Sequence, residues 1–184
     1  MNHPGHVRFV GVGEAFAASD ALNTSVLVVG SQTLLFDCGP SIPAALFGFG
    51  LHPDAIDGVF VSHLHGDHVF GLPFLLARLH EDGRTKPLQI LCGPAADGEG
   101  VLAHVLSLSR LAYGSIFAKL GYPLEEVVVA PGQPRDWGRA RLATAESAHA
   151  RRNHALSFQQ DGVRVGLSGD GDFTPATRAL FAGS

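Results

Sequence analysis

Nine short, mostly apolar runs punctuated by turn residues predict β-strands along this chain. Two of the turns are specific. Gly30-Ser31-Gln32 joins the second and third runs, and Asp161-Gly162 joins the eighth and ninth. The dipeptide Asp-Gly favours a tight type I′ hairpin. The nine runs cover residues 6–13, 24–29, 33–37, 58–62, 88–92, 126–130, 140–146, 155–160 and 163–169.

Four further segments have the features of helices. Two of them place a proline, Pro43 or Pro73, in a first-turn position, and a third carries apolar residues at helical spacing. The fourth begins with Thr174-Pro175, a pair suited to a helix cap and first turn. Early strands, then alternating strands and helices, then a hairpin predict β-sheets covered by helices. The helical segments cover residues 41–50, 71–83, 99–115 and 174–183.

Length and composition predict one globular domain over residues 1–184, with 46% hydrophobic and 16% charged residues. The net charge of −4 gives no general attraction to nucleic acid. The sequence contains no run apolar enough to cross a membrane and no signal-peptide pattern, so a cytoplasmic protein is expected. Cys38 and Cys92 each end an apolar run and are expected to be buried free thiols, with a disulfide as the minor alternative.

The ten histidines include a cluster, His63-Leu64-His65-Gly66-Asp67-His68, that lies between an apolar strand and an apolar helix. Imidazole and carboxylate groups suit Zn²⁺, Mn²⁺ or Fe²⁺, and the lack of thiolates disfavours a purely structural zinc site. His63 and His65 can point the same way, whereas the residues beyond Gly66 can reach another point. This favours two neighbouring metal ions. A solvated histidine-rich loop is the weaker alternative, because both flanks are apolar.

The motif His-x-His-x-Asp-His after an apolar strand resembles the signature of metallo-β-lactamase fold hydrolases. Asp37-Cys38-Gly39, Ser168-Gly169-Asp170 and the lone His149 resemble further motifs of the same family. The resemblance implies an α/β fold in which two mixed β-sheets form an αββα sandwich flanked by helices. It also implies that His63, His65 and His149 hold one metal ion, Asp67 and His68 hold a second, Asp170 touches both, and Asp37 supports the ligands.

Three of these assignments have competitors in the sequence. His154 follows His149 closely, although spacing to the next strand favours His149. Asp172 competes with Asp170, which directly follows the apolar strand and is preferred. Asp37 could merely cap the next segment, because aspartate often does so.

The resemblance implies a hydrolase with two Zn²⁺ ions, or Mn²⁺ or Fe²⁺ in their place, and a metal-bound hydroxide that Asp67 orients. Catalysis would depend on Asp67 and His65. The segments 11–29 and 154–170 are most similar to the tRNase Z and phosphodiesterase branch, which implies phosphodiesters in RNA or small nucleotides as substrates. The sequence shows no Gly/Pro-rich arm for tRNA, so a small phosphodiester is favoured over RNA. Arg151 and Arg152 could contact phosphate or could be solvated loop charges.

The sequence departs from the family pattern after Asp172, because no later residue matches the final histidine ligand. The C-terminal part of the fold is therefore expected to be missing or shortened. A weakened second metal site and a free sheet edge would follow, and a homodimer could cover that edge. The alternatives are a non-catalytic or mononuclear metal-binding protein and a thioester or lactam hydrolase of the same fold.

Overall fold

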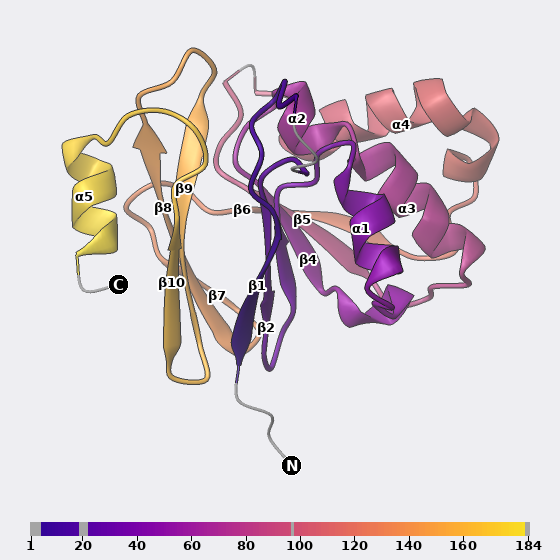
Figure 1. Cartoon of the computed structure of the whole chain (residues 1–184), viewed down its shortest axis with the longest axis horizontal. Helices are drawn as coiled ribbons and strands as arrows, with labels where there is room; N and C mark the ends of the chain where they lie inside the picture. The colour runs from indigo at the N-terminus through magenta and orange to yellow at the C-terminus, as the bar shows by residue number, and fades with distance from the viewer. Residues whose placement is uncertain (1–4, 19–21, 97, 183–184) are drawn as a thin grey trace.

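Two β-sheets pack face to face in the computed structural model, which describes residues 5–18, 22–96 and 98–182 (Figure 1). The first sheet has six strands in the order β1-β2-β3-β4-β5-β6. Its first three strands are antiparallel neighbours, and β3 to β6 run parallel, so this sheet is mixed as predicted. The strands are β1 (His6–Gly11), β2 (Ser25–Val29), β3 (Leu34–Phe36), β4 (Gly58–Val61), β5 (Leu88–Cys92) and β6 (Leu124–Val128).

The second sheet has four described strands in the order β10-β9-β8-β7. Every pair in it is antiparallel, so the expectation of two mixed sheets is wrong for this sheet. The reason is the short connections between its consecutive strands, because parallel neighbours need a long crossover. The strands are β7 (Arg135–Trp137), β8 (Ala140–Ser147), β9 (Asn153–Gln160) and β10 (Val163–Leu167).

Helices lie on the outer faces of the two sheets (Figure 1). Three of them, α1 (Ile42–Gly48), α3 (Leu72–Glu81) and α4 (Val101–Phe117), cover the first sheet. The last helix, α5 (Pro175–Phe181), lies against β8 and β9 of the second sheet. It begins with the capping interaction expected of Thr174, whose side chain accepts from the Thr177 amide. The turn-like elements α2 (Gly66–Val69) and η1 (Pro53–Ala55) complete the described helices.

The hydrophobic core has two layers, one on each face of the first sheet. Leu35 and Val59 face the helices, whereas Phe36 and Phe60 face the second sheet, where they stack at 5.4 Å between ring centroids. This burial on both faces explains why β3 and β4 read as unbroken apolar runs, as is typical of the middle strands of a parallel sheet. The loops at the C-terminal ends of these strands are therefore held by a rigid scaffold.

The nine predicted strands and four predicted helices all form, with shifted boundaries. No boundary moves by more than two residues; β6, for example, begins at Leu124 instead of 126, where it pairs with Leu88 of β5. The hairpin prediction is confirmed by φ angles of 49° at Asp161 and 79° at Gly162. Residue 183 of the last predicted helix and residues 19–21 of the family-like opening segment lie outside the described residues.

Three elements were not predicted from the sequence: β7, α2 and the 3-10 turn η1. Strand β7 escapes notice because it is a short edge strand in which only Trp137 is buried. Helix α2 lies inside the histidine cluster and is a single turn, too short to show periodicity. The two cysteines are buried and free, as predicted. None of the helices in the described part of the chain is long and apolar enough to cross a membrane.

Candidate metal centre

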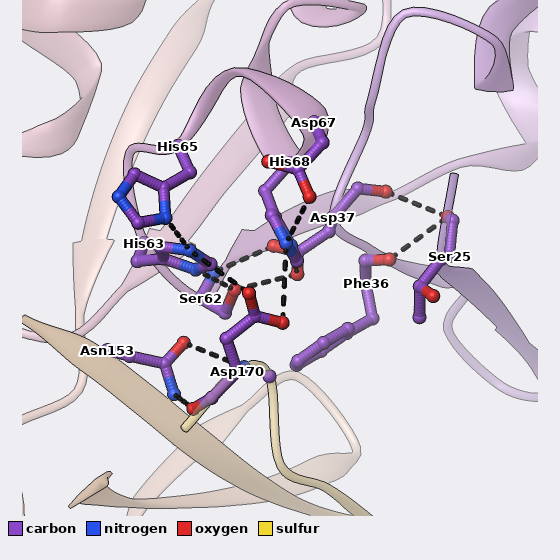
Figure 2. Close-up of polar contacts among 12 residues, drawn as sticks. Ser25, Phe36, Asp37, Ser62, His63, His65, Asp67, His68, Asn153 and Asp170 are labelled. Carbon is purple, nitrogen blue, oxygen red and sulfur yellow. Dashed lines mark hydrogen bonds and ion pairs between the residues drawn. The ribbon is translucent and has the colours of Figure 1, made fainter. Parts of the chain in front are cut away.

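The histidine cluster lies at the C-terminal end of β4 and meets two loops from the second sheet (Figure 2). His63 and His65 follow β4, and Asp67 and His68 lie on α2. His149 comes from the loop between β8 and β9, and Asp170 from the loop after β10. All six residues that the sequence suggested as metal ligands are thus brought together where the two sheets meet.

The first group of potential ligands consists of three histidines and Asp170. The nitrogens converge on His65, whose Nδ1 lies 2.9 Å from His63 Nε2 and 3.1 Å from His149 Nε2. Asp170 Oδ2 lies 3.8 Å from His63 Nε2 and 3.9 Å from His149 Nε2. An ion about 2.0–2.2 Å from each atom fits such a set, and the N₃O donors suit Zn²⁺.

The second group shares Asp170 with the first. His68 Nε2 lies 3.0 Å from Asp67 Oδ2 and 3.5 Å from Asp170 Oδ1. Asp170 therefore turns one carboxylate oxygen to each group, which is the arrangement needed to bridge two ions. The described residues supply four ligand residues to the first group and three to the second.

Asp37 holds His68 directly, and His63 through Ser62, by the Nδ1 atom of each ring. It is fully buried, and its Oδ2 accepts hydrogen bonds of 2.7 Å from both Ser62 Oγ and His68 Nδ1. Because the Ser62 hydroxyl donates to Asp37, it accepts from His63 Nδ1 at 3.0 Å. His63 therefore carries its proton on Nδ1 and turns an unprotonated Nε2 to the cluster. Such outer partners orient metal-binding imidazoles.

The surroundings give two of the histidines very different proton affinities. Burial and the positive charge of His68 lower the pKa of His63 to about 3, so His63 is neutral. Burial opposes charge on His68 as well, but the Asp37 hydrogen bond and the charges of Asp37, Asp67 and Asp170 outweigh it and raise the pKa to about 9. Without a metal ion His68 is therefore a cation at neutral pH, and an ion that binds Nε2 must displace a proton.

Asn153 was not singled out in the sequence, yet it fixes the loop that carries Asp170. Its Nδ2 donates to Ser147 Oγ at 2.6 Å, to Ser168 O at 3.1 Å and to Asp170 O at 2.7 Å. Asn153 is fully buried at the start of β9. Neither Asn153 nor Ser62 belongs to a recognisable motif, so their roles become visible only in the fold.

For each proposed ligand that had a competitor in the sequence, the structure shows which of the two residues lies in a ligand group. His149 lies in the first group, whereas His154 is buried on β9 and faces a cavity beside the cluster. Asp170 lies in both groups, whereas Asp172 forms a backbone bridge with Ala148. Asp37 binds Ser62 and His68, so it does more than cap a segment.

Arg151 and Arg152, the suggested phosphate contacts, lie on the exposed loop between β8 and β9, and both line the cavity beside the cluster. Arg152 also pairs with Glu146, with 3.2 Å between Nε and Oε1.

Gly39 lets the segment after β3 pass close to α2. The Cys38 amide donates to His68 O at 2.7 Å, and a Cβ on Gly39 would lie 2.0 Å from the Asp67 carbonyl oxygen. We expect Gly39→Ala to displace α2, to lower the free energy of unfolding by about 1–3 kcal/mol and to weaken metal binding. Chemical denaturation and metal titration would check this. Gly48→Ala is the control, because nothing lies within 4 Å of a Cβ there; equal effects would contradict the prediction.

Comparisons with known proteins agree with this geometry. The family model described as anti-Pycsar protein Apyc1 matches residues 6–182. Ribonuclease Z of Enterococcus faecalis is 34% identical over 119 residues, which cover 62% of this chain and 38% of that protein. Ribonuclease BN of Erwinia tasmaniensis is 35% identical over 135 residues, which cover 70% and 40%. The chain therefore spans about two fifths of the length of these curated relatives.

Solved structures show the same fold at low identity. The short form of human tRNase Z has a TM-score of 0.77 and 22% identity, over 95% of this chain and 73% of that one. The metallo-β-lactamase fold protein YhfI from Bacillus subtilis has a TM-score of 0.71 and 20% identity, over 94% and 64%. These likenesses confirm the predicted metallo-β-lactamase fold.

Proposed function

The chain belongs to the family of the anti-Pycsar protein Apyc1, and from this premise we propose that it is a metal-dependent hydrolase of a small nucleotide phosphodiester. The observation that carries the proposal is the pair of ligand groups joined by Asp170. Such paired sites suit in-line displacement at phosphorus, because both attacking and leaving oxygens need stabilisation. The names of the ribonuclease Z and ribonuclease BN relatives also support a phosphodiester substrate.

In this proposal His63, His65, His149 and Asp170 hold one divalent ion, and Asp67, His68 and Asp170 hold a second. Zn²⁺ is the proposed metal, with Mn²⁺ or Fe²⁺ as substitutes. Bound ions would lower the pKa of a coordinated water and offset negative charge on the phosphoryl group. The second ion would bind more weakly, because only three described residues can reach it.

The side chains around the ions have separate tasks. The half-buried Asp67 carboxylate accepts a hydrogen bond from the attacking water and so orients it. Asp37 and Ser62 hold His68 and His63 so that their Nε2 atoms face the reaction. Arg151 and Arg152 lie on the loop after His149 beside the metal centre and attract anionic groups of the substrate.

Removal of metal is expected to abolish hydrolysis of a chromogenic phosphodiester such as bis(p-nitrophenyl) phosphate, with recovery on addition of Zn²⁺ or Mn²⁺. Elemental analysis of the purified chain should give between one and two ions, the second lost first on dialysis. No turnover with added metal would refute the proposal and would favour a non-catalytic or mononuclear metal-binding protein. Turnover of thioesters or lactams alone would assign a different hydrolase of the same fold.

The substrate class is tested by competition between a cyclic mononucleotide and a precursor tRNA. The acidic net charge of −4 disfavours a large RNA contact, so kcat/KM is expected to be higher for the small substrate. Preference for the tRNA would instead assign the activity that the names of the ribonuclease Z relatives describe.

A further inference from the structure

A small cavity of about 60 Å³ adjoins the metal centre. Its floor is formed where β4 and β5 end, and its walls come from the start of α4 and the loop that enters β9. His63 belongs to both the cavity and the first ligand group, so the two spaces are adjacent. The C-terminal ends of parallel strands are a usual place for ligands in layered α/β proteins.

Ser62, His63 and His154 are buried polar residues that line this cavity, and the side chains of the first two are hydrogen-bonded to each other. The third is His154. The residue is only 4% exposed, and its backbone amide donates to Ser62 O at 3.0 Å, which fixes β9 to the end of β4. Its imidazole makes no hydrogen bond with any residue that the structure describes, and neither ring nitrogen is a fully enclosed unpaired atom, so the nitrogens are open to the cavity. Burial lowers the pKa of His154, so the ring is neutral and one nitrogen remains a donor.

Gly93 leaves the room that this imidazole occupies. A Cβ on Gly93 would lie 2.2 Å from Cγ of His154 and 2.3 Å from its Nδ1, so any side chain there would displace the ring. The ring therefore lies against the backbone at Gly93, and the backbone of His154 is fixed by its hydrogen bond to Ser62 O.

The charge around the cavity is positive. Arg151 and Arg152 line it, and no carboxylate occurs among the described residues that do so. Arg152 is partly neutralised by Glu146, whereas Arg151 has no ion pair within the part of the chain that the structure describes. The cavity thus combines the His154 imidazole, a donor without a partner among the described residues, with the guanidinium of Arg151. This pair of groups is suited to bind an anionic oxygen group.

We propose that this cavity binds a second oxyanion of the substrate, with His154 as the specificity-determining donor and Arg151 as its counter-charge. The inference rests on the proposed function, because it adds a phosphate or carboxylate next to the phosphodiester held at the metal centre. Substrates that carry such a group are then preferred over those that carry the scissile phosphate alone.

The preference is measured with two dinucleotides, UpU and its 5′-phosphorylated form pUpU. Because hydrogen bonds to charged groups are comparatively strong, we expect the metal-loaded wild type to favour pUpU by about tenfold or more in kcat/KM. The ratio should fall to about one in His154→Leu and in Arg151→Ala, and the loss should be in KM. Arg151 is exposed, so its variant tests the inference even where His154→Leu does not fold. Arg110→Ala, a change of another exposed arginine, should keep the wild-type ratio.

The dinucleotide assay and a calorimetric titration with inorganic phosphate together distinguish failure of this inference from failure of the proposed function. Hydrolysis of both dinucleotides with a wild-type ratio near one, or a ratio unchanged by both variants, overturns the inference and leaves the proposed function intact. No hydrolysis of either dinucleotide or of the cyclic mononucleotide refutes the proposed function; phosphate binding that weakens about tenfold in both variants would then still support the anion site. Phosphate binding that the variants leave unchanged overturns the site as well.

Discussion

His65→Ala is expected to abolish metal binding at the first ligand group together with phosphodiester hydrolysis. His65 Nδ1 lies 2.9 Å from His63 Nε2 and 3.1 Å from His149 Nε2, so its loss opens the centre of the group. Loss of one group that stabilises transition-state charge already costs about 10²–10³-fold in rate, and loss of an ion removes more than one such interaction. The loss of kcat/KM should therefore be at least about 10²–10³-fold.

The measurement combines elemental analysis of the purified variant with an assay on a chromogenic phosphodiester. His104→Ala is the control, because His104 is a half-buried histidine on α4 outside both ligand groups. Its metal content and activity should match those of the wild type. Equal losses in the two variants would refute the assignment of the ligands.

The second large effect is expected from Asp37, because this carboxylate is buried and accepts three hydrogen bonds from Ser62 and His68. Asp37→Ala leaves Ser62 N and His68 Nδ1 without an acceptor. Breaking a buried charged pair typically costs about 3–5 kcal/mol of unfolding free energy. Chemical denaturation in the presence of a chelator would measure this loss without the contribution of bound metal.

Asp37→Asn separates the effect on the metal site from the effect on stability. The amide has nearly the same shape, but its NH₂ group would face His68 Nδ1 and favour the tautomer with the proton on Nε2. Metal affinity should fall about 10–100-fold, as is typical when a partner of a ligand histidine is lost, and competition with a chromophoric chelator would show it. The exposed Asp82, paired with Arg78, provides the control Asp82→Asn. If Asp37→Asn kept the wild-type affinity for metal, Asp37 would contribute to stability alone.

Much of the fold could be predicted from the sequence, because local residue preferences and the burial of apolar side chains favour the same elements. Leu34–Phe36 and Gly58–Val61 are apolar on both faces and form the middle of the first sheet. The Asp161-Gly162 turn and the Thr174 cap depend only on neighbouring residues and form as predicted. Strand β7 was missed because an edge strand with one buried residue carries almost no apolar signal.

The sequence by itself determined the kind of chemistry. His63-x-His65-x-Asp67-His68 lies within six residues, so its ligand types and its place after β4 follow from local sequence. The tertiary structure decided which distant residues join it. His149 approaches His65 across 84 residues, and Asn153, which no motif marks, fixes the loop of Asp170. These contacts depend on how two sheets are registered against each other, and that register is set by packing between them rather than by any local pattern.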